Sequence, residues 1–226
     1  MIQSLTTDEL SKYVSNQINS FFPDLETVDL VIDNKFTIEA LERVEFCFKH
    51  VKLKNYFNDN VVYFNHLYSD HYVMFIWYLS NTVYNYLGKC NLANKLYYLN
   101  KVLHGLDCMY DTKLPNIFLL FHSSGTMLGK AQYDDFFVAL HGCTVGSQKG
   151  NYPTFGKGVS LTANSSVIGN CIIGNRCTIA TRTTIFQKIL ENDTTAFIDF
   201  DSGAIQFKKS NKCYAQQFFN IDLNNL

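Results

Sequence analysis

Six histidines and seven cysteines are the side chains of this chain best suited to acid–base or metal chemistry. No two cysteines are separated by two residues, the spacing typical of zinc and redox sites. His66 and His71 are five positions apart, which misses the i,i+4 spacing of two metal ligands on one helix. We therefore expect no metal site and reduced cysteines. An imidazole with an ordinary pKa of about 6.5 can instead accept a proton near neutral pH, as a general base.

The second half of the chain has a six-residue period. Apolar residues return at every sixth place, at Phe155, Leu161, Val167, Ile173, Ile179 and Ile185. Six residues turn an α-helix by about 240° and give it no apolar face, whereas six is a multiple of the two-residue period of a strand. Short strands joined by tight corners satisfy the period, and glycine and asparagine suit such corners. The pattern predicts a parallel β-helix, with Cys143, Cys171 and Cys177 filling its interior.

The first half of the chain has helical patterns. Thr6 and Glu9 have capping-box spacing, which predicts the start of a helix. In a second segment, Leu41, Val44 and Phe48 stand at helical intervals. Further helices are expected from a Ser69 or Asp70 cap to Gly88 and from Asn91 to Gly105. The predicted fold is α+β: a helical domain over 1–106, a β-helix over 107–190 with a loop at 147–154, and a strand-like or hairpin tail over 191–226.

Composition narrows the possible partners. The chain is 47% hydrophobic and 17% charged, as is usual for a folded domain, and its formal net charge is -1. That balance gives no electrostatic reason to expect nucleic acid or an anionic membrane. The longest apolar run, which starts at Tyr72, is too short to span a bilayer, and no leader segment opens the sequence. We expect a cytoplasmic protein.

The segment LDCMYDTKLPNIFLLFHSSGTMLG, together with the hexads, resembles the hexapeptide-repeat acyltransferases, and among them the serine acetyltransferase-like group. The likeness covers residues 67–190. It implies a left-handed β-helix, a homotrimer with active sites between subunits, and acetyl-CoA as cosubstrate. The segment matches without a gap the family stretch that carries a catalytic aspartate and, fifteen places on, a catalytic histidine. These positions are Asp107 and His122.

Such a pair suits acyl transfer from a thioester to a hydroxyl. The base removes the hydroxyl proton as the oxygen attacks, and a carboxylate behind the imidazole fixes its tautomer. The resemblance makes His122 the base and Asp107 the residue that orients it. Both substrates would react directly in a ternary complex, without an acyl-enzyme.

The sequence departs from the serine acetyltransferases at the acceptor positions. Phe121 stands where they have an aspartate, and Asn151 and Tyr152 stand where they have an arginine and a histidine that help to bind serine. A free amino acid then lacks partners for its two charges, and burying an unpaired charge is unfavourable. We therefore expect a sugar hydroxyl as acceptor, in polysaccharide biosynthesis. The expected acceptor-binding residues are Phe121, His141, Asn151 and Tyr152.

The resemblance also implies a coenzyme A groove lined by small residues, namely Gly146, Ser147, Ala163 and Thr181. Three other functions remain open at this point. The acceptor could be serine despite the substitutions, or the amine of an amino sugar, which also requires a base. The chain could also form an inactive trimer that serves as a scaffold.

Overall fold

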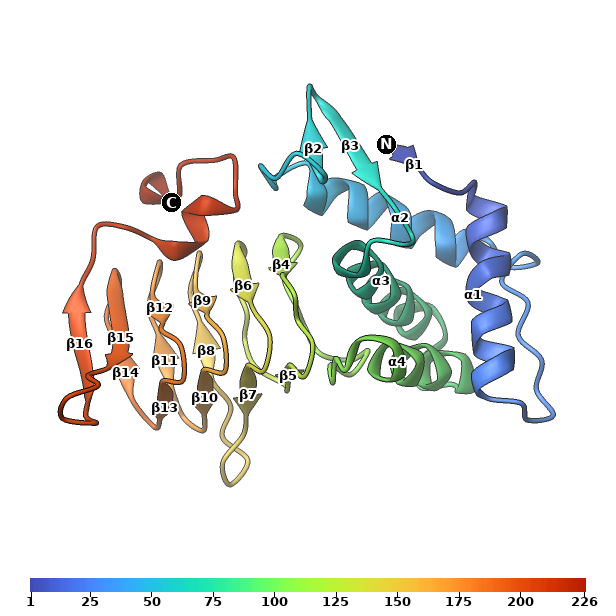
Figure 1. Cartoon of the computed structure of the whole chain (residues 1–226). Coiled ribbons are helices and arrows are strands. Elements are labelled where there is room, and N and C mark those ends of the chain that lie inside the picture. The colour runs from blue at the N-terminus through green and yellow to red at the C-terminus, as the bar shows by residue number, and fades with distance from the viewer.

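The computed structural model describes residues 1–226 and places four α-helices in the first half of the chain (Figure 1). They are α1 (Thr7–Phe21), α2 (Lys35–Phe48), α3 (Ser69–Leu87) and α4 (Asn91–His104). α3 lies at the centre of this part, buried from Asp70 to Val83, and packs against α2 and α4. A small sheet of β1 (Ile2–Gln3), β3 (Val61–Phe64) and β2 (Phe57–Asn58) completes it.

The local signals for the helices are present in the structure. The Thr6 hydroxyl accepts the N–H of Glu9, and the Glu9 carboxylate accepts the N–H of Thr6, so the expected capping box forms. α4 ends at Gly105, which has a left-handed φ of 67°, as a glycine C-cap requires. None of the helices combines the length and the apolar character needed to cross a bilayer.

The second half of the chain is a parallel β-helix of short strands, which confirms the predicted fold class. Its strands are β4 (Phe118–Leu120), β5 (Met127–Leu128), β6 (Phe137–Ala139), β7 (Thr144–Gly146), β8 (Thr154–Phe155), β9 (Ser160–Leu161), β10 (Ser166–Ile168), β11 (Ile172–Ile173), β12 (Thr178–Ile179), β13 (Thr184–Phe186), β14 (Ile189–Leu190) and β15 (Thr194–Ile198). They form three sheets, in the orders β5-β7-β10-β13, β8-β11-β14 and β4-β6-β9-β12-β15. Each of the three middle turns adds one strand to each sheet, whereas in the first turn only a single bridge, from Gln132 to Thr154, reaches the β8 sheet.

The six-residue period fills the interior of the coil. Val167 lies beside Val145 and Ile185 in neighbouring turns, and all three side chains are fully buried. The cysteines expected at interior positions are also fully buried: Cys143, Cys171 and Cys177. Stacked apolar side chains of successive turns therefore form a continuous core along the coil.

The coil continues beyond Leu190, where we expected it to end. β15 joins the sheet of β12 in parallel, with Ala196 at a fully buried position. The expected hairpin forms between β15 and β16 (Ile205–Lys209), which pair antiparallel. The chain then turns back along the coil to the helical part, where Phe219 pairs with Val51 (Figure 1).

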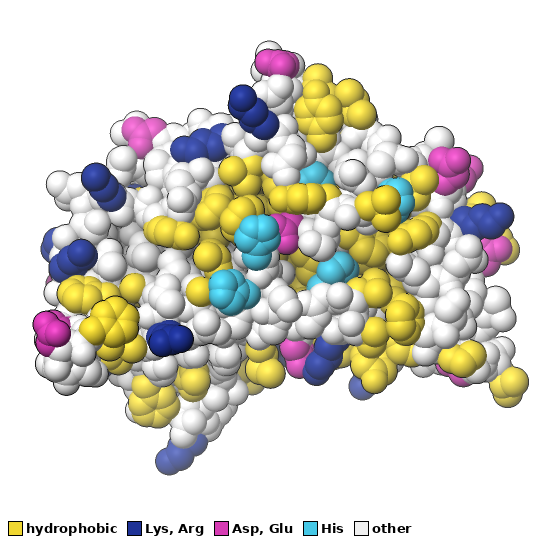
Figure 2. Space-filling model, in the orientation of Figure 1, with side chains coloured by type: hydrophobic (Ala, Val, Ile, Leu, Met, Phe, Trp, Pro, Cys, Tyr) yellow, Lys and Arg dark blue, Asp and Glu magenta, His cyan; other side chains and the backbone are white.

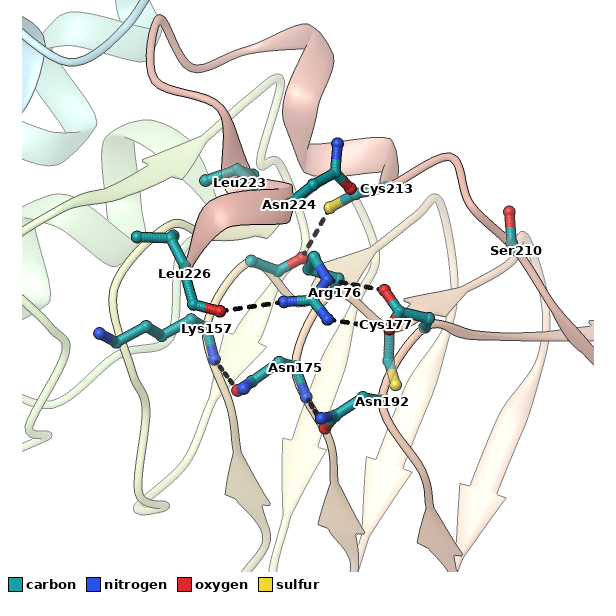
Figure 3. A network of polar contacts seen from close by, with 12 residues as sticks. Lys157, Asn175, Arg176, Cys177, Asn192, Ser210, Cys213, Leu223, Asn224 and Leu226 are labelled. Carbon is teal, nitrogen blue, oxygen red and sulfur yellow. Dashed lines mark hydrogen bonds and ion pairs between the residues drawn. The ribbon is translucent and has the colours of Figure 1, made fainter.

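Hydrogen bonds between successive turns hold one corner of the coil together (Figure 3). The N–H of Lys157 donates to Asn175 Oδ1, and the N–H of Asn175 donates to Asn192 Oδ1. Glycine makes room for this ladder, because a Cβ at Gly174 would lie 2.6 Å from the backbone nitrogen of Asn192. Arg176 pairs there with Asp193 and donates to the carbonyl of Leu226, which ties the end of the chain to the coil.

Candidate active site

His122 lies at the corner that follows β4, in the first turn of the coil. Its backbone has a left-handed φ of 51°, which is unusual for a residue other than glycine. The N–H of His122 donates to Asp70 Oδ1 over 3.1 Å, and its ring Nδ1 lies 3.2 Å from Asp70 Oδ2. The His122 side chain is 65% exposed, whereas that of Asp70 is 5% exposed. A buried carboxylate thus holds an imidazole that is open to solvent.

Asp70 belongs to the first turn of α3, in the helical domain. The expected Asp70 or Ser69 cap is wrong, because the N-cap residue is Tyr68 and no side chain caps the helix. Burial raises the pKa of the Asp70 carboxyl, and the backbone N–H and the ring of His122 oppose that rise. Oδ2 is buried and has no hydrogen-bond donor of its own within the chain. His122 Nδ1 is therefore the side-chain nitrogen that faces this oxygen.

A pocket of about 350 Å³ lies beside this pair, between the helical domain and the coil. It is lined by Ser69, Asp70, Val73, Leu103, His104, His122, Ser123 and Ser124. Figure 2 shows histidine side chains gathered on this face, near the middle of the molecule. Burial lowers the pKa of His104 to about 4, so this histidine is neutral near pH 7. The lining offers hydroxyls and imidazoles but no lysine or arginine.

The structure does not pair Asp107 with His122. Asp107 Oδ1 accepts a hydrogen bond from the Tyr97 hydroxyl over 2.7 Å, and Oδ2 accepts one from Lys101 Nζ over 2.6 Å. Burial acts to raise the pKa of Asp107, but these two hydrogen bonds outweigh it and leave the pKa lowered. The expected orienting residue is thus engaged with α4, and Asp70 stands at His122 in its place. No sequence motif marks Asp70 for this position.

Four of the expected site residues form a corner column along the coil. The register pairs Leu120 with Ala139, Ala139 with Leu161 and Leu161 with Ile179. Two places after each of these, in successive turns, stand His122, His141, Ala163 and Thr181. His141 and Thr181 are exposed, and Ala163 is half-buried. The expected base, one expected acceptor residue and two expected coenzyme residues therefore share one edge of the molecule.

Phe121 adjoins this column but faces the tail. Its ring packs against Phe218 with a centroid distance of 5.2 Å and lies 4.1 Å from the His122 ring. Phe121, an expected acceptor-binding residue, thus places an apolar ring beside His122.

The remaining expected residues lie at the next corner of the coil. Gly146 ends β7, and Ser147 leads into a loop closed by two hydrogen bonds between Gln148 and Asn151. Asn151 and Tyr152 line a second pocket, of about 650 Å³, which shares no lining residue with the His122 pocket. Within one chain, the expected acceptor residues are therefore split between two places.

No protein-family model matches the chain, and no curated protein matches it in sequence. Solved structures of serine acetyltransferases do match it in three dimensions. A serine acetyltransferase in complex with cysteine has a TM-score of 0.69 at 17% identity, over 92% of this chain and 82% of that one. The Neisseria gonorrhoeae serine acetyltransferase in complex with serine has 0.61 at 20%, over 83% and 80%.

A serine acetyltransferase in complex with CoA has a TM-score of 0.62 at 17% identity, over 83% of this chain and 79% of that chain. These likenesses include both the helical part and the coil, since each covers more than four fifths of this chain. The chain therefore has the fold of the serine acetyltransferases, a helical domain followed by a hexapeptide β-helix.

Proposed function

We propose that the chain is an acetyl-CoA-dependent acetyltransferase that acetylates a hydroxyl, with His122 as the general base. The observation that carries this proposal is the exposed imidazole of His122, backed by a buried carboxylate at the edge of a pocket. The fold shared with serine acetyltransferases supports the same reaction class.

The reaction needs one proton acceptor and no covalent intermediate on the protein. The acceptor oxygen attacks the thioester carbonyl carbon as His122 Nε2 takes the hydroxyl proton. The C–S bond then breaks, and the imidazolium returns the proton to the coenzyme A thiolate. A base in this position accelerates such a step by roughly 10²- to 10⁴-fold. The His122 side chain is 65% exposed, which leaves Nε2 accessible for this role.

Acetyl-CoA would lie along the corner column. Ala163 and Thr181 have small side chains, which allow an extended pantetheine arm to approach the backbone. Gly146 and Ser147 stand at a different corner, so a ligand that contacts both sets would bridge two chains. We propose a homotrimer in which the column of one subunit faces the loop corner of the next. Asn151 and Tyr152 would then reach the neighbouring His122 pocket.

Serine is the acceptor that the comparisons favour, because one of the matched structures holds serine and another holds cysteine. A neutral sugar hydroxyl is the second candidate. It is favoured by the absence of lysine and arginine from the lining of the His122 pocket and by the uncharged side chains of Phe121, Asn151 and Tyr152. A sugar acceptor would suit a role in polysaccharide modification.

Labelled acetyl-CoA and a panel of acceptors test the proposal. Purified protein is incubated with serine, with neutral sugars and nucleotide sugars, and with amino sugars, and the products are treated with hydroxylamine, which cleaves esters but not amides. We expect an ester product that depends on His122 and is absent with His122→Gln. His50→Gln, at a half-buried histidine that contacts Phe46, is the matched control and should retain activity. Amide products alone would indicate N-acetylation, and failure to bind coenzyme A in calorimetry would support an inactive scaffold.

A further inference from the structure

We propose that Asp70, and not Asp107, is the residue that positions His122, by holding the proton of its neutral ring on Nδ1. The catalytic consequence of this inference rests on the proposed function, but its geometric basis does not. It makes the helical domain part of the active site, because Asp70 belongs to α3 and His122 to the coil.

The first argument is the state of the two Asp70 oxygens. Oδ1 accepts the backbone N–H of His122, whereas Oδ2 is buried and accepts no hydrogen bond within the chain. An unsatisfied buried acceptor is unfavourable, and a carboxylate can only accept. His122 Nδ1 lies 3.2 Å from this oxygen, and an N–H on Nδ1 is the donor that a rotation of the exposed ring would bring onto it. This choice leaves the lone pair on Nε2, which is the form that a general base needs.

The second argument is charge. The titratable groups that line the pocket are Asp70, His104 and His122, and burial keeps His104 neutral near pH 7. No lysine or arginine lies within ion-pair distance of Asp70, so its single cationic partner is the imidazolium that forms when His122 accepts a proton. Asp70 would therefore stabilise the His122 ring most strongly when the ring has accepted the proton and become positively charged.

The third argument excludes Asp107 as it stands. Tyr97 and Lys101 each donate to one of its oxygens, and Lys101 already neutralises its charge. Asp107 could reach His122 only by giving up one of these two partners. Its backbone instead bridges to Met127, the first residue of β5.

A purely structural role for Asp70 is the rival interpretation, because its hydrogen bond to the His122 N–H also ties α3 to the coil. Asp70→Asn separates the two roles. The asparagine carbonyl can keep the backbone hydrogen bond, but its NH₂ group then faces Nδ1 and can only donate. The substitution should therefore move the His122 proton from Nδ1 to Nε2, which is the wrong tautomer for a base.

Ring ¹⁵N NMR of the full-length protein, labelled on histidine, reads this tautomer directly. The His122 signals are assigned from their loss in His122→Gln. We expect the Nδ1–H tautomer in the unmodified protein and in Asp107→Asn, and the Nε2–H tautomer in Asp70→Asn. Asp135→Asn is the matched control, since Asp135 also accepts a backbone N–H, that of Ile117, but pairs with no histidine. It should leave the His122 tautomer unchanged.

Acetyl transfer provides the second readout. Asp70→Asn should lower kcat by about 10²-fold or more, and Asp107→Asn by less than about tenfold. An Nε2–H tautomer in the unmodified protein would overturn the inference even if Asp70→Asn did not fold. A change of tautomer in Asp107→Asn, but not in Asp70→Asn, would also overturn it. A lack of acetyl transfer by the unmodified protein would refute the proposed function alone, because the tautomer would still decide the role of Asp70.

Discussion

His71 is a buried histidine that must stay uncharged while the helical domain is folded. Its side chain lies among aromatic rings, with ring-centroid distances of 4.3 Å to Tyr56 and 4.6 Å to Tyr68, and the residue is 1% exposed. Nδ1 accepts the N–H of Asn65, and Nε2 has no partner. Burial lowers the pKa of His71 to about 3. We predict that this residue makes the protein sensitive to mild acid.

The direction of this pH dependence follows from the number of protons that the folded and the unfolded chain bind. Between pH 6.5 and pH 3 the unfolded chain protonates His71 and the folded chain does not, so the free energy of unfolding falls as the pH falls. Within that window the free energy of unfolding falls by up to about 1.4 kcal/mol per pH unit. At pH 5 the accumulated loss is about 2 kcal/mol. His104, whose pKa burial lowers to about 4, should contribute a similar loss over its own window.

Urea unfolding at pH 7 and pH 5 tests this prediction, followed by the fluorescence of Trp77, the single tryptophan. His71→Phe keeps an aromatic ring but cannot be protonated. It should lower the free energy of unfolding at pH 7 by about 1–2 kcal/mol, because the Asn65 N–H loses its acceptor. Between pH 7 and pH 5, the free energy of unfolding of His71→Phe should fall by about 2 kcal/mol less than that of the unmodified protein. The same pH dependence in both proteins would refute the reasoning.

Three further predictions concern the coil. Ile179→Ala, at a fully buried position, should lower the free energy of unfolding in urea by about 2–5 kcal/mol. Ile172→Ala, at a half-exposed position, should lower it by less than about 1 kcal/mol. Equal losses in the two variants would contradict the assignment of the interior. Arg176→Met should speed proteolysis of the residues after Lys212, since it removes the bond to Leu226, and an unchanged cleavage rate would show that the tail is held elsewhere. Gly174→Ala should lower the unfolding free energy by about 1–3 kcal/mol, because a Cβ there meets Asn192, and a neutral effect would show that the corner can widen.

Periodic patterns in the sequence predicted most of the fold. Val167 and Ile185 stack because a six-residue step preserves the inward direction of a strand, and the capping box at Thr6 marks the start of α1. The end of the coil was harder to predict. β15 keeps the coil geometry, but its buried residues are Thr194 and Ala196, so the strand lacks the large apolar residue that marks the others.

The candidate site was predicted only in part. His122 and the corner column follow from the register of the coil once its strands are placed. The partner of His122 does not, because Asp70 is far away in sequence and its approach depends on how α3 packs on the coil. The hydrogen bond from Lys101 to Asp107 was not predictable for the same reason, because it depends on where the end of α4 places the Lys101 side chain. Contacts between separately predicted elements were the part that local patterns could not supply.

The rate of coenzyme A release from acetyl-CoA in the presence of an acceptor hydroxyl tests the central claim most directly. The claim predicts steady thiol release by the unmodified protein with serine or a sugar as acceptor. His122→Gln should lower that rate by about 10²-fold or more, with acetyl-CoA binding in calorimetry unchanged. Equal rates in the two proteins, with both folded and both binding acetyl-CoA, would show that His122 is not the base.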